Sequence, residues 1–403
     1  MDGPKPAFGD LPPEICLLIA KHTRSRRALG SLSRVNRYFH QIFNPCLYQY
    51  NVRRRRGCSA LVWAARFNRE ATARIALEYQ TPLRQTAPLV VAAVSGHDRI
   101  VELLLAKDGV NIEATLPDKY TPLELAVREG HEAVVKLLLD AGANLEPRKT
   151  RFETLCGDGP LLFQAVKGGH PGVVRRLVEC GGVDVNEEAR VGGTALVLAV
   201  RLGKPEIVKC LLVAGADPNV TSPWGTPIHS AIYGNRAEIV RIFVECDEVD
   251  INLVPGLGDT PLSYAITKPP LAELLLRRKD LDVNTKLPFE KAINRGEVDL
   301  AKALLATNRL NQKSRLEGLL TAIRLNLEST NSLIPLIVAS GLVYDDKVEK
   351  YSFEYLLRRA RDVGNTAATK ALRRQETGGS TRLTRWAQRL RRSGHSVFEG
   401  AFG

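Results

Sequence analysis

The sequence has 403 residues, 44% of them hydrophobic, and a formal net charge of +13. It contains no run of 18 uncharged apolar residues and no charged-then-apolar signal pattern, so we expect neither a membrane-spanning helix nor secretion. The seven cysteines stand singly, without a C-x-x-C pair or a histidine at metal-ligand spacing. This spacing argues against a disulfide framework or a zinc site and favours a reducing location, cytoplasmic, nuclear or both.

The positive charge is concentrated at the two ends of the chain. Residues 1–57 carry 11 Lys and Arg against 3 Asp and Glu, and residues 351–403 carry 11 against 4. The stretch 58–350 therefore carries 35 basic against 37 acidic residues. Because this middle part supplies none of the excess charge, we expect no specific nucleic-acid binding by the protein as a whole.

The first predicted element is a small helical segment that ends before residue 58. Its apolar spacing predicts helices over 14–22, from 25 or 27 to about 38, and over 39–47, with Asp10 as a suitable N-cap. A helical unit of roughly 40 residues lies near the lower size limit for independent folding.

The run Leu11-Pro12-Pro13-Glu14-Ile15 and the apolar positions after it resemble an F-box, in the variant common in fungal proteins. The resemblance implies docking on a Skp-type adaptor of a cullin-RING ubiquitin ligase through Leu11, Pro12, Glu14, Ile15, Ile19, Leu32 and Val35. Where the family has a proline and an acidic residue before its second helix, this chain has the basic stretch Lys21–Arg27. The alternative is a helical cap that covers the first unit of the following array.

Four consecutive arginines, Arg53–Arg56, follow this segment. They fit either a nuclear-import or phosphate-binding patch or a solvated junction.

The next stretch, Thr121–Asn144, reads as a pair of short helices. Thr121 can cap the first helix with Pro122 at its first position, and Gly130 can end it in the left-handed conformation. His131 then opens a second helix that is apolar over most of its circumference. One such pair cannot bury its own apolar surface, so it needs a stacked copy.

Copies of this stretch recur along the chain. Equivalents of the Thr121 position, which we call anchors, fall at Ser59, Ala87, Thr121, Pro160, Thr194, Thr226, Thr260, Leu287 and Glu317. Their spacing of about 33 residues, with Thr-Pro-Leu and Gly-His pairs in register, resembles the ankyrin repeat family. The resemblance implies an all-α solenoid of helix-turn-helix units with short β-hairpin or turn connections, in a fungal type of arrangement preceded by the F-box-like domain.

The resemblance also implies that partners lie across the concave side, on the loop tips and the exposed positions of the first helices. The expected partner is a protein target, bound through Lys119, Tyr120, Glu124, Arg128, Arg190, Arg201, Trp224 and Tyr233. Trp224 is a large aromatic among turn residues, which suits either a binding anchor or packing onto the next hairpin. The basic connector 147–152 suits either a projecting finger or a tolerated insertion.

Later units depart from the pattern, and the tail differs again. Asn68, Asn235 and Asn326 replace the helix-ending glycine, and 351–361 with 366–374 predict one last helix pair. Beyond 375, the basic stretch Arg382–Arg392 fits a short helix that contacts acidic surfaces, packs back on the array or stays disordered.

We expect no catalytic, cofactor-binding or metal-binding residues. His97, His131, His170 and His229 fall where the repeat motif carries hydrogen-bonding histidines, and no nucleophile, phosphate-loop or zinc motif is present. The predicted organisation is an F-box-like domain with its basic junction (1–57), about nine repeats (58–343), degenerate capping helices (344–374) and a basic tail (375–403). The predicted function is protein recruitment without enzymatic activity.

Overall fold

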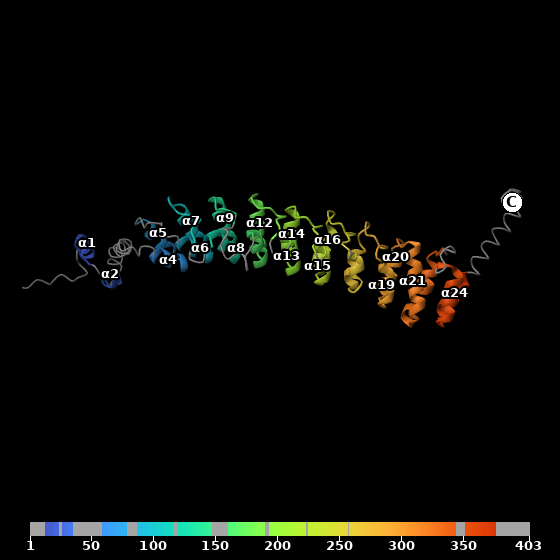
Figure 1. Ribbon diagram of the computed structural model, residues 1–403. Coiled ribbons are helices and arrows are strands. Elements are labelled where there is room, and N and C mark those ends of the chain that lie inside the picture. The colour runs from blue at the N-terminus through green and yellow to red at the C-terminus, as the bar shows by residue number, and fades with distance from the viewer. Residues whose placement is uncertain are drawn as a thin grey trace, which may run out of the picture. The chain divides into compact units, whose positions relative to one another are not determined.

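A computed structural model describes residues 13–23, 26–34, 59–78, 87–115, 120–146, 160–189, 193–222, 225–256, 258–343 and 351–375. The chain divides into two units, Met1–Ala216 and Asp217–Gly403. Figure 1 labels helices of both units. Across the described residues the regular structure is helical and contains no strand, as expected for an all-α fold. The expected hairpins are represented there by one isolated bridge, between Ser222 and Gly225.

The first unit begins with two helices and continues with pairs of helices. The two are α1 (Pro13–His22) and α2 (Arg26–Leu32). The pairs are α4 (Ser59–Arg66) with α5 (Glu70–Glu78), α6 (Ala87–Val94) with α7 (Asp98–Leu105), α8 (Pro122–Glu129) with α9 (Glu132–Asp140), α11 (Leu161–Gly168) with α12 (Pro171–Glu179), and α13 (Ala195–Leu202) with α14 (Pro205–Val213).

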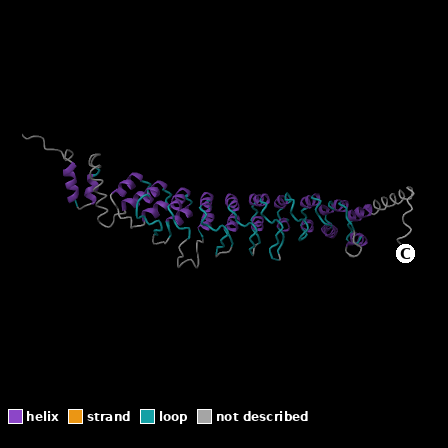
Figure 2. Cartoon of the chain, turned by 90° about the horizontal axis from the view of Figure 1, so that it is seen from above, coloured by secondary structure: helices purple, strands orange, loops and turns teal. Residues whose placement is uncertain are grey.

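The second unit begins with three helix pairs of the same kind and ends with helices that do not follow this pattern. Its pairs are α15 (Pro227–Tyr233) with α16 (Ala237–Glu245), α17 (Pro261–Ala265) with α18 (Pro269–Leu275), and α19 (Pro288–Asn294) with α20 (Val298–Ala306). They are followed by α21 (Gln312–Leu325), α22 (Glu328–Asn331), α23 (Ile334–Ala339), α24 (Phe353–Asp362) and a final helix over 366–375. In this unit the loops leave the helix pairs on one side (Figure 2).

Local chemistry sets the bounds of each pair, as α8 shows. The Thr121 hydroxyl accepts from the Glu124 N–H at 3.2 Å, and the Glu124 carboxylate accepts from the Thr121 N–H at 2.6 Å. This reciprocal capping box satisfies two N–H groups that the helix cannot pair by itself. Gly130 ends the helix at φ 82°, a conformation that glycine adopts without steric cost.

Two of the predictions about helix bounds can be compared with the structure. Asn68, Asn235 and Asn326 do adopt positive φ, which confirms their role as glycine replacements. The second helix of the N-terminal segment ends at Leu32 rather than near residue 38, because Ser33 turns back to donate to the Gly30 carbonyl at 3.0 Å. The predicted third helix, over 39–47, lies outside the described residues.

The anchor placed at Glu317 was wrong. Glu317 lies in the middle of α21, and that helix is capped instead by Asn311, whose side chain accepts from the Ser314 N–H at 2.8 Å. The spacing to the previous anchor is therefore shorter than expected. Asn311 offers the cap that a Thr-Pro pair supplies elsewhere, so the helix starts early.

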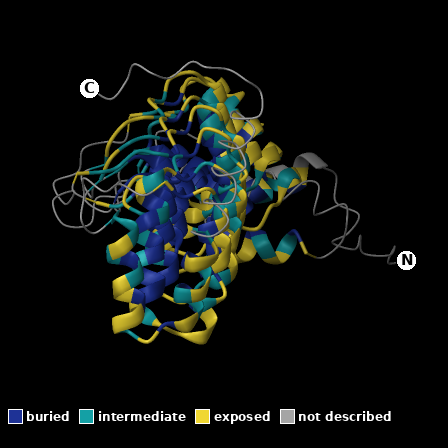
Figure 3. Ribbon diagram, turned by 90° about the vertical axis from the view of Figure 1, so that its right-hand side faces the viewer, coloured by how far each residue is buried: buried dark blue, intermediate teal, exposed yellow. Residues whose placement is uncertain are grey.

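Within each unit, apolar side chains between successive pairs form the core, and the buried stretches of the chain are dark blue in Figure 3. In the α8–α9 pair, Leu123, Val127, Val134 and Leu138 are all at most 1% exposed. Within each unit, first helices pack on the neighbouring first helices and second helices on second helices. Each pair therefore buries its apolar face only against copies of itself.

Histidines at the start of second helices connect one pair to the previous one. His97 Nδ1 lies 2.7 Å from the Ala65 carbonyl, and the Nε2 atoms of His131 and His170 lie 3.0 and 3.1 Å from the carbonyls of Val94 and Arg128. Each accepting carbonyl belongs to the last turn of the preceding first helix, which has no intrahelical partner. The predicted hydrogen-bonding role of these histidines is confirmed.

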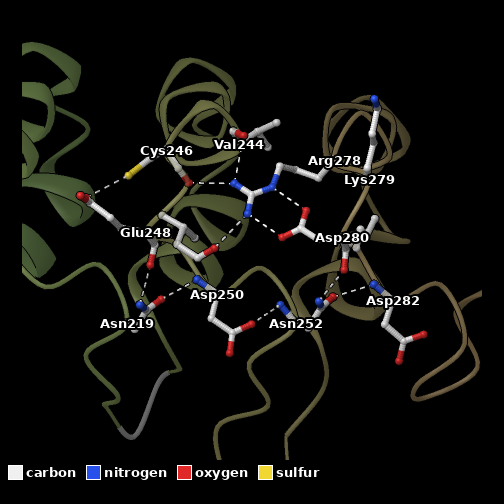
Figure 4. A network of polar contacts seen from close by, with 12 residues as sticks. Asn219, Val244, Cys246, Glu248, Asp250, Asn252, Arg278, Lys279, Asp280 and Asp282 are labelled. Atoms are coloured by element: carbon white, nitrogen blue, oxygen red, sulfur yellow. Dashed lines mark hydrogen bonds and ion pairs between the residues drawn. The ribbon is translucent and has the colours of Figure 1, made fainter.

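Asparagines form a second series of links between pairs (Figure 4). Asn219 donates to the Glu248 carbonyl and accepts from the Asp250 N–H, both at 2.8 Å. Asn252 makes the equivalent bonds to Asp280 and Asp282 one pair later, at 2.8 and 2.7 Å. Each asparagine thus ties the loop of one pair to the loop of the next.

Arg278 makes a third contact between pairs, at the end of α16 (Figure 4). Its guanidinium donates to the carbonyls of Val244, Cys246 and Val249 at 2.8 to 3.3 Å and forms a two-bond ion pair with Asp280 at 2.7 Å. A cation at the C-terminal end of α16 donates to carbonyls that the helix end leaves without intrahelical partners. None of the described helices has the length and apolarity needed to cross a membrane.

Candidate protein-binding surface

The first helices carry one exposed face, made by the fourth, seventh and eighth residues after each anchor. In α8 these residues are Leu125, Arg128 and Glu129, which share a side of the helix because they are three and four apart. The opposite side, with Leu123 and Val127, is buried. We call this surface the first-helix face and describe it separately in each unit.

Apolar side chains gather on this face although they are exposed. Twelve large apolar side chains are exposed among the described residues, and six of them occupy these positions: Trp63, Phe67, Val94, Leu202, Tyr233 and Tyr264. An exposed set of this kind that recurs on one side of successive first helices marks an interaction surface rather than scattered exposure.

In the Asp217–Gly403 unit the face is hollowed between α15, α17 and α19. The hollow measures about 610 Å³ and is lined mainly by Tyr233, Tyr264, Asp259, Lys268, Lys291 and Arg295. Tyr233 is 76% exposed, and the Lys268 ammonium lies 5.9 Å from the centre of its ring. The same ammonium donates to the carbonyls of Ile232 and Tyr233 at 2.6 Å, so it also caps α15.

A polar cluster forms the floor of this hollow. Lys291 donates to Asp259 at 2.5 Å and to the Ser263 hydroxyl at 2.6 Å, and that hydroxyl donates to Asp259 at 3.2 Å. Burial alone raises the pKa of Asp259, but the hydrogen bond and charge of Lys291 outweigh it and bring that pKa below its usual value. An ammonium that donates to the hydroxyl cannot take its proton, so the cluster orders the surface and does not activate the serine.

His229 lies beneath the same cluster. Its Nδ1 lies 2.8 Å from the Thr226 hydroxyl, and its Nε2 lies 3.0 Å from the Asp259 carbonyl. Burial lowers the pKa of His229 despite the hydrogen bond to that carbonyl, which favours the neutral ring. The histidine therefore joins the cap of α15 to the loop of the next pair.

Several predicted target-binding residues lie on the first-helix face. Arg128, Arg201 and Tyr233 are exposed at its seventh position, and the Arg128 guanidinium stands 5.5 Å from the centre of the half-buried Tyr120 ring. Lys119, Arg190 and Trp224 lie outside the described residues, as does the connector 147–152.

The prediction for Glu124 needs correction. This side chain was expected to face a partner, but it is only 5% exposed because its carboxylate closes the capping box on Thr121. It stabilises α8 and is not presented to a partner.

Residues predicted for adaptor docking are only partly described. On α1, Ile15 is exposed and Ile19 half-buried, and Leu32 at the end of α2 is half-buried. Glu14 belongs to α1. Leu11, Pro12 and Val35 lie outside the described residues. The binding roles of all these residues stay predictions.

Sequence reasoning missed Trp63, Phe67, Tyr264 and Lys291. The rings of Trp63 and Phe67 lie 5.4 Å apart on α4, both about half exposed. A signal was available, because all four residues fall at the fourth or eighth position after an anchor. Among the described residues no cluster of three His, Cys, Asp or Glu could hold a metal ion.

Comparison with protein families identifies the repeated unit. A family model described as ankyrin repeats (3 copies) matches residues 30–116, 61–149, 146–222 and 196–287, together more than half of the chain. Arrays of these repeats are protein-interaction modules with extended binding surfaces, and proteins built from them are generally non-enzymatic scaffolds.

Individual proteins resemble the chain over its repeats. It is 28% identical over 184 residues to human transient receptor potential cation channel subfamily A member 1, covering 43% of this chain and 16% of the relative. It is 27% identical over 208 residues to human Rabankyrin-5, covering 45% and 18%. It is 35% identical over 94 residues to protein phosphatase 1 regulatory subunit 12A of Mus musculus, covering 23% and 9%.

The chain therefore spans less than a fifth of the length of these relatives. Among solved structures, the human ASB11 ankyrin repeat domain is similar with a TM-score of 0.44 and 23% identity, over 56% of this chain and 99% of that one.

Proposed function

The chain belongs to the ankyrin repeat family, and from that premise we propose that it recruits a protein target to a cullin-RING ubiquitin ligase. The F-box-like helices dock a Skp-type adaptor, and the first-helix face of the repeats binds the target. The chain itself brings the target close to the ligase, and the other ligase subunits catalyse the modification of the target. We place this function in the cytoplasm, the nucleus or both.

The exposed face of α1 carries the adaptor part of the proposal. Ile15 is 43% exposed and Leu18 51% exposed, three residues apart and so on one side of the helix, whereas Cys16 and Ala20 are buried. A short helix that leaves two large apolar side chains in water has surface for a partner. Ile15 is also part of the F-box-like run.

Co-expression with a Skp-type adaptor tests this part. We expect the wild-type chain to co-purify with the adaptor and the double variant Ile15→Ala, Leu18→Ala to lose it. His22→Ala, at an exposed position of the same helix, is the matched control and should retain the adaptor. Retention by the double variant, or absence of binding by the wild-type chain, contradicts the proposal.

A second candidate is a scaffold without a ubiquitin role, in which the N-terminal helices only cap the repeats. The basic stretch Lys21–Arg27 favours it, because this stretch departs from the F-box pattern. In that case removal of residues 1–57 lowers the thermal stability of the first repeats, and no adaptor binds to the intact chain.

A further inference from the structure

The charges on the two kinds of helix in the Met1–Ala216 unit are arranged differently. Every ion pair between described residues of this unit joins side chains of second helices: Arg74–Glu70, Arg99–Glu102, Arg176–Glu132, Arg176–Glu179 and Lys209–Glu206. Four cations of the second helices thus have carboxylate partners on the same or the neighbouring second helix, whereas Lys136 and Arg175 form no ion pair with the described residues.

The first helices carry a row of exposed cations. The seventh position after the anchor is Arg128 in α8, Lys167 in α11 and Arg201 in α13, three successive helices, and all three side chains are exposed. Neither Arg128 nor Arg201 takes part in an ion pair with the described residues. The one carboxylate on the first-helix face of these three helices is Glu129.

Toward the beginning of the unit, the exposed side chains of the first helices become mostly apolar. The seventh position of α6 is the exposed Val94, and α4 presents the rings of Trp63 and Phe67. The seventh position of α4 is the exposed Arg66, whose guanidinium lies 5.9 Å from the centre of the Phe67 ring. Successive first helices pack on one another from α4 to α13, so the apolar end and the basic end belong to one surface. The surface is therefore graded: α4 and α6 expose Trp63, Phe67 and Val94 with the single cation Arg66, whereas α8, α11 and α13 each expose a cation and only Leu202 as a large apolar side chain.

We propose that this graded surface binds an extended protein segment with apolar side chains at one end and carboxylates at every third residue along the rest. Packed helices lie about 8–10 Å apart, and an extended chain advances about 3.3 Å per residue, so one repeat matches three residues. The carboxylates face Arg128, Lys167 and Arg201, and the apolar end covers Val94 and the α4 rings. This deepens the proposed function, since it specifies the chemistry of the recruited target.

The test uses the full chain and a fluorescein-labelled peptide of about 15 residues with this pattern, followed by fluorescence anisotropy. The variant Arg128→Ala, Arg201→Ala should weaken binding about tenfold at 0.1 M salt, since two partly screened ion pairs are lost. The matched control is Lys136→Ala, Arg175→Ala, which removes two exposed cations from second helices and should change affinity less than about twofold.

Two further arms examine spacing and the nature of the partner. A peptide of the same composition with its carboxylates consecutive should bind several-fold more weakly than the patterned peptide. Equal binding of the two peptides, equal losses in both variants, or no binding of the patterned peptide would overturn the proposal. The proposal would also be overturned if a single-stranded RNA with the same charge bound more tightly than the patterned peptide, and if the variant Arg128→Ala, Arg201→Ala abolished that RNA binding. The first variant keeps α1 intact, so adaptor capture tests the proposed function independently of these outcomes.

Discussion

Single polar side chains join one repeat to the next. Arg278 reaches three carbonyls at the end of the preceding second helix, and Asn252 bonds two main-chain groups of the following loop. These contacts satisfy backbone groups that helix ends leave without partners. Removal of such a side chain therefore costs more than its own hydrogen bonds where a part-buried carbonyl is left without a donor.

Replacement of Arg278 by Met should lower the free energy of unfolding of the second unit by about 2 kcal/mol, since its carbonyl partners and Asp280 lose their donor. The neighbouring Arg277 is exposed, so Arg277→Met should change that free energy by less than about 0.5 kcal/mol. Urea titration followed by circular dichroism measures both variants. Equal effects would mean that Arg278 acts only through its charge.

At the scale of the element, the junction between the two helices of a repeat depends on a glycine and a histidine from neighbouring repeats. Gly130 adopts φ 82°, and a side chain added there would place its Cβ 2.4 Å from Nδ1 of His170. His170 in turn contacts the Arg128 carbonyl at 3.1 Å. The close approach of a ring to the main chain thus links the two repeats.

The variants Gly130→Ala and Gly142→Ala separate the cost of a left-handed backbone from the cost of a clash with the His170 ring. Both glycines have positive φ, but an added Cβ at Gly142 meets no atom within 4 Å. We expect Gly142→Ala to cost about 1 kcal/mol for the left-handed backbone, and Gly130→Ala to cost about 1 kcal/mol more because His170 must move. Equal losses of stability in urea titrations would show that the histidine contact contributes nothing.

At the scale of the whole molecule, each repeat contacts only its neighbours, so the effect of a missing end should stay local. In the second unit, α21 packs against α24, where Leu356 and Ala360 are fully buried. The Asn365 amide donates to Asn331 at 2.7 Å, which connects the final helices to α22. These last helices therefore serve as the cap of this unit.

A chain truncated after residue 343 should lose amide-exchange protection in α21–α23, because their apolar surface becomes exposed to water. The amides of α15 and α16 should keep their protection. Truncation after residue 375 is the control and should leave the protection of α21 unchanged. Hydrogen exchange followed by mass spectrometry distinguishes these outcomes, and a loss of protection throughout the unit would contradict the local description.

The helix pairs could be predicted from the sequence, because the signals that start and end each helix are local. A capping Thr121, a following proline, apolar residues at helical spacing and a glycine at φ 82° act within about ten residues, and most predicted anchors coincide with the starts of first helices. The anchor at Glu317 failed because the equivalent cap, Asn311, comes early and carries none of the Thr-Pro-Leu motif.

Which polar residues remain available to a partner depends on how successive repeats pack, and the sequence pattern did not predict it. Glu124 reads as a surface carboxylate but closes a buried capping box, whereas Lys291, Ser263 and Asp259 meet only when successive repeats stack. The physical reason is that these contacts join residues up to about thirty positions apart, and their geometry depends on how neighbouring helices pack. Helical periodicity describes one element at a time and does not contain that information.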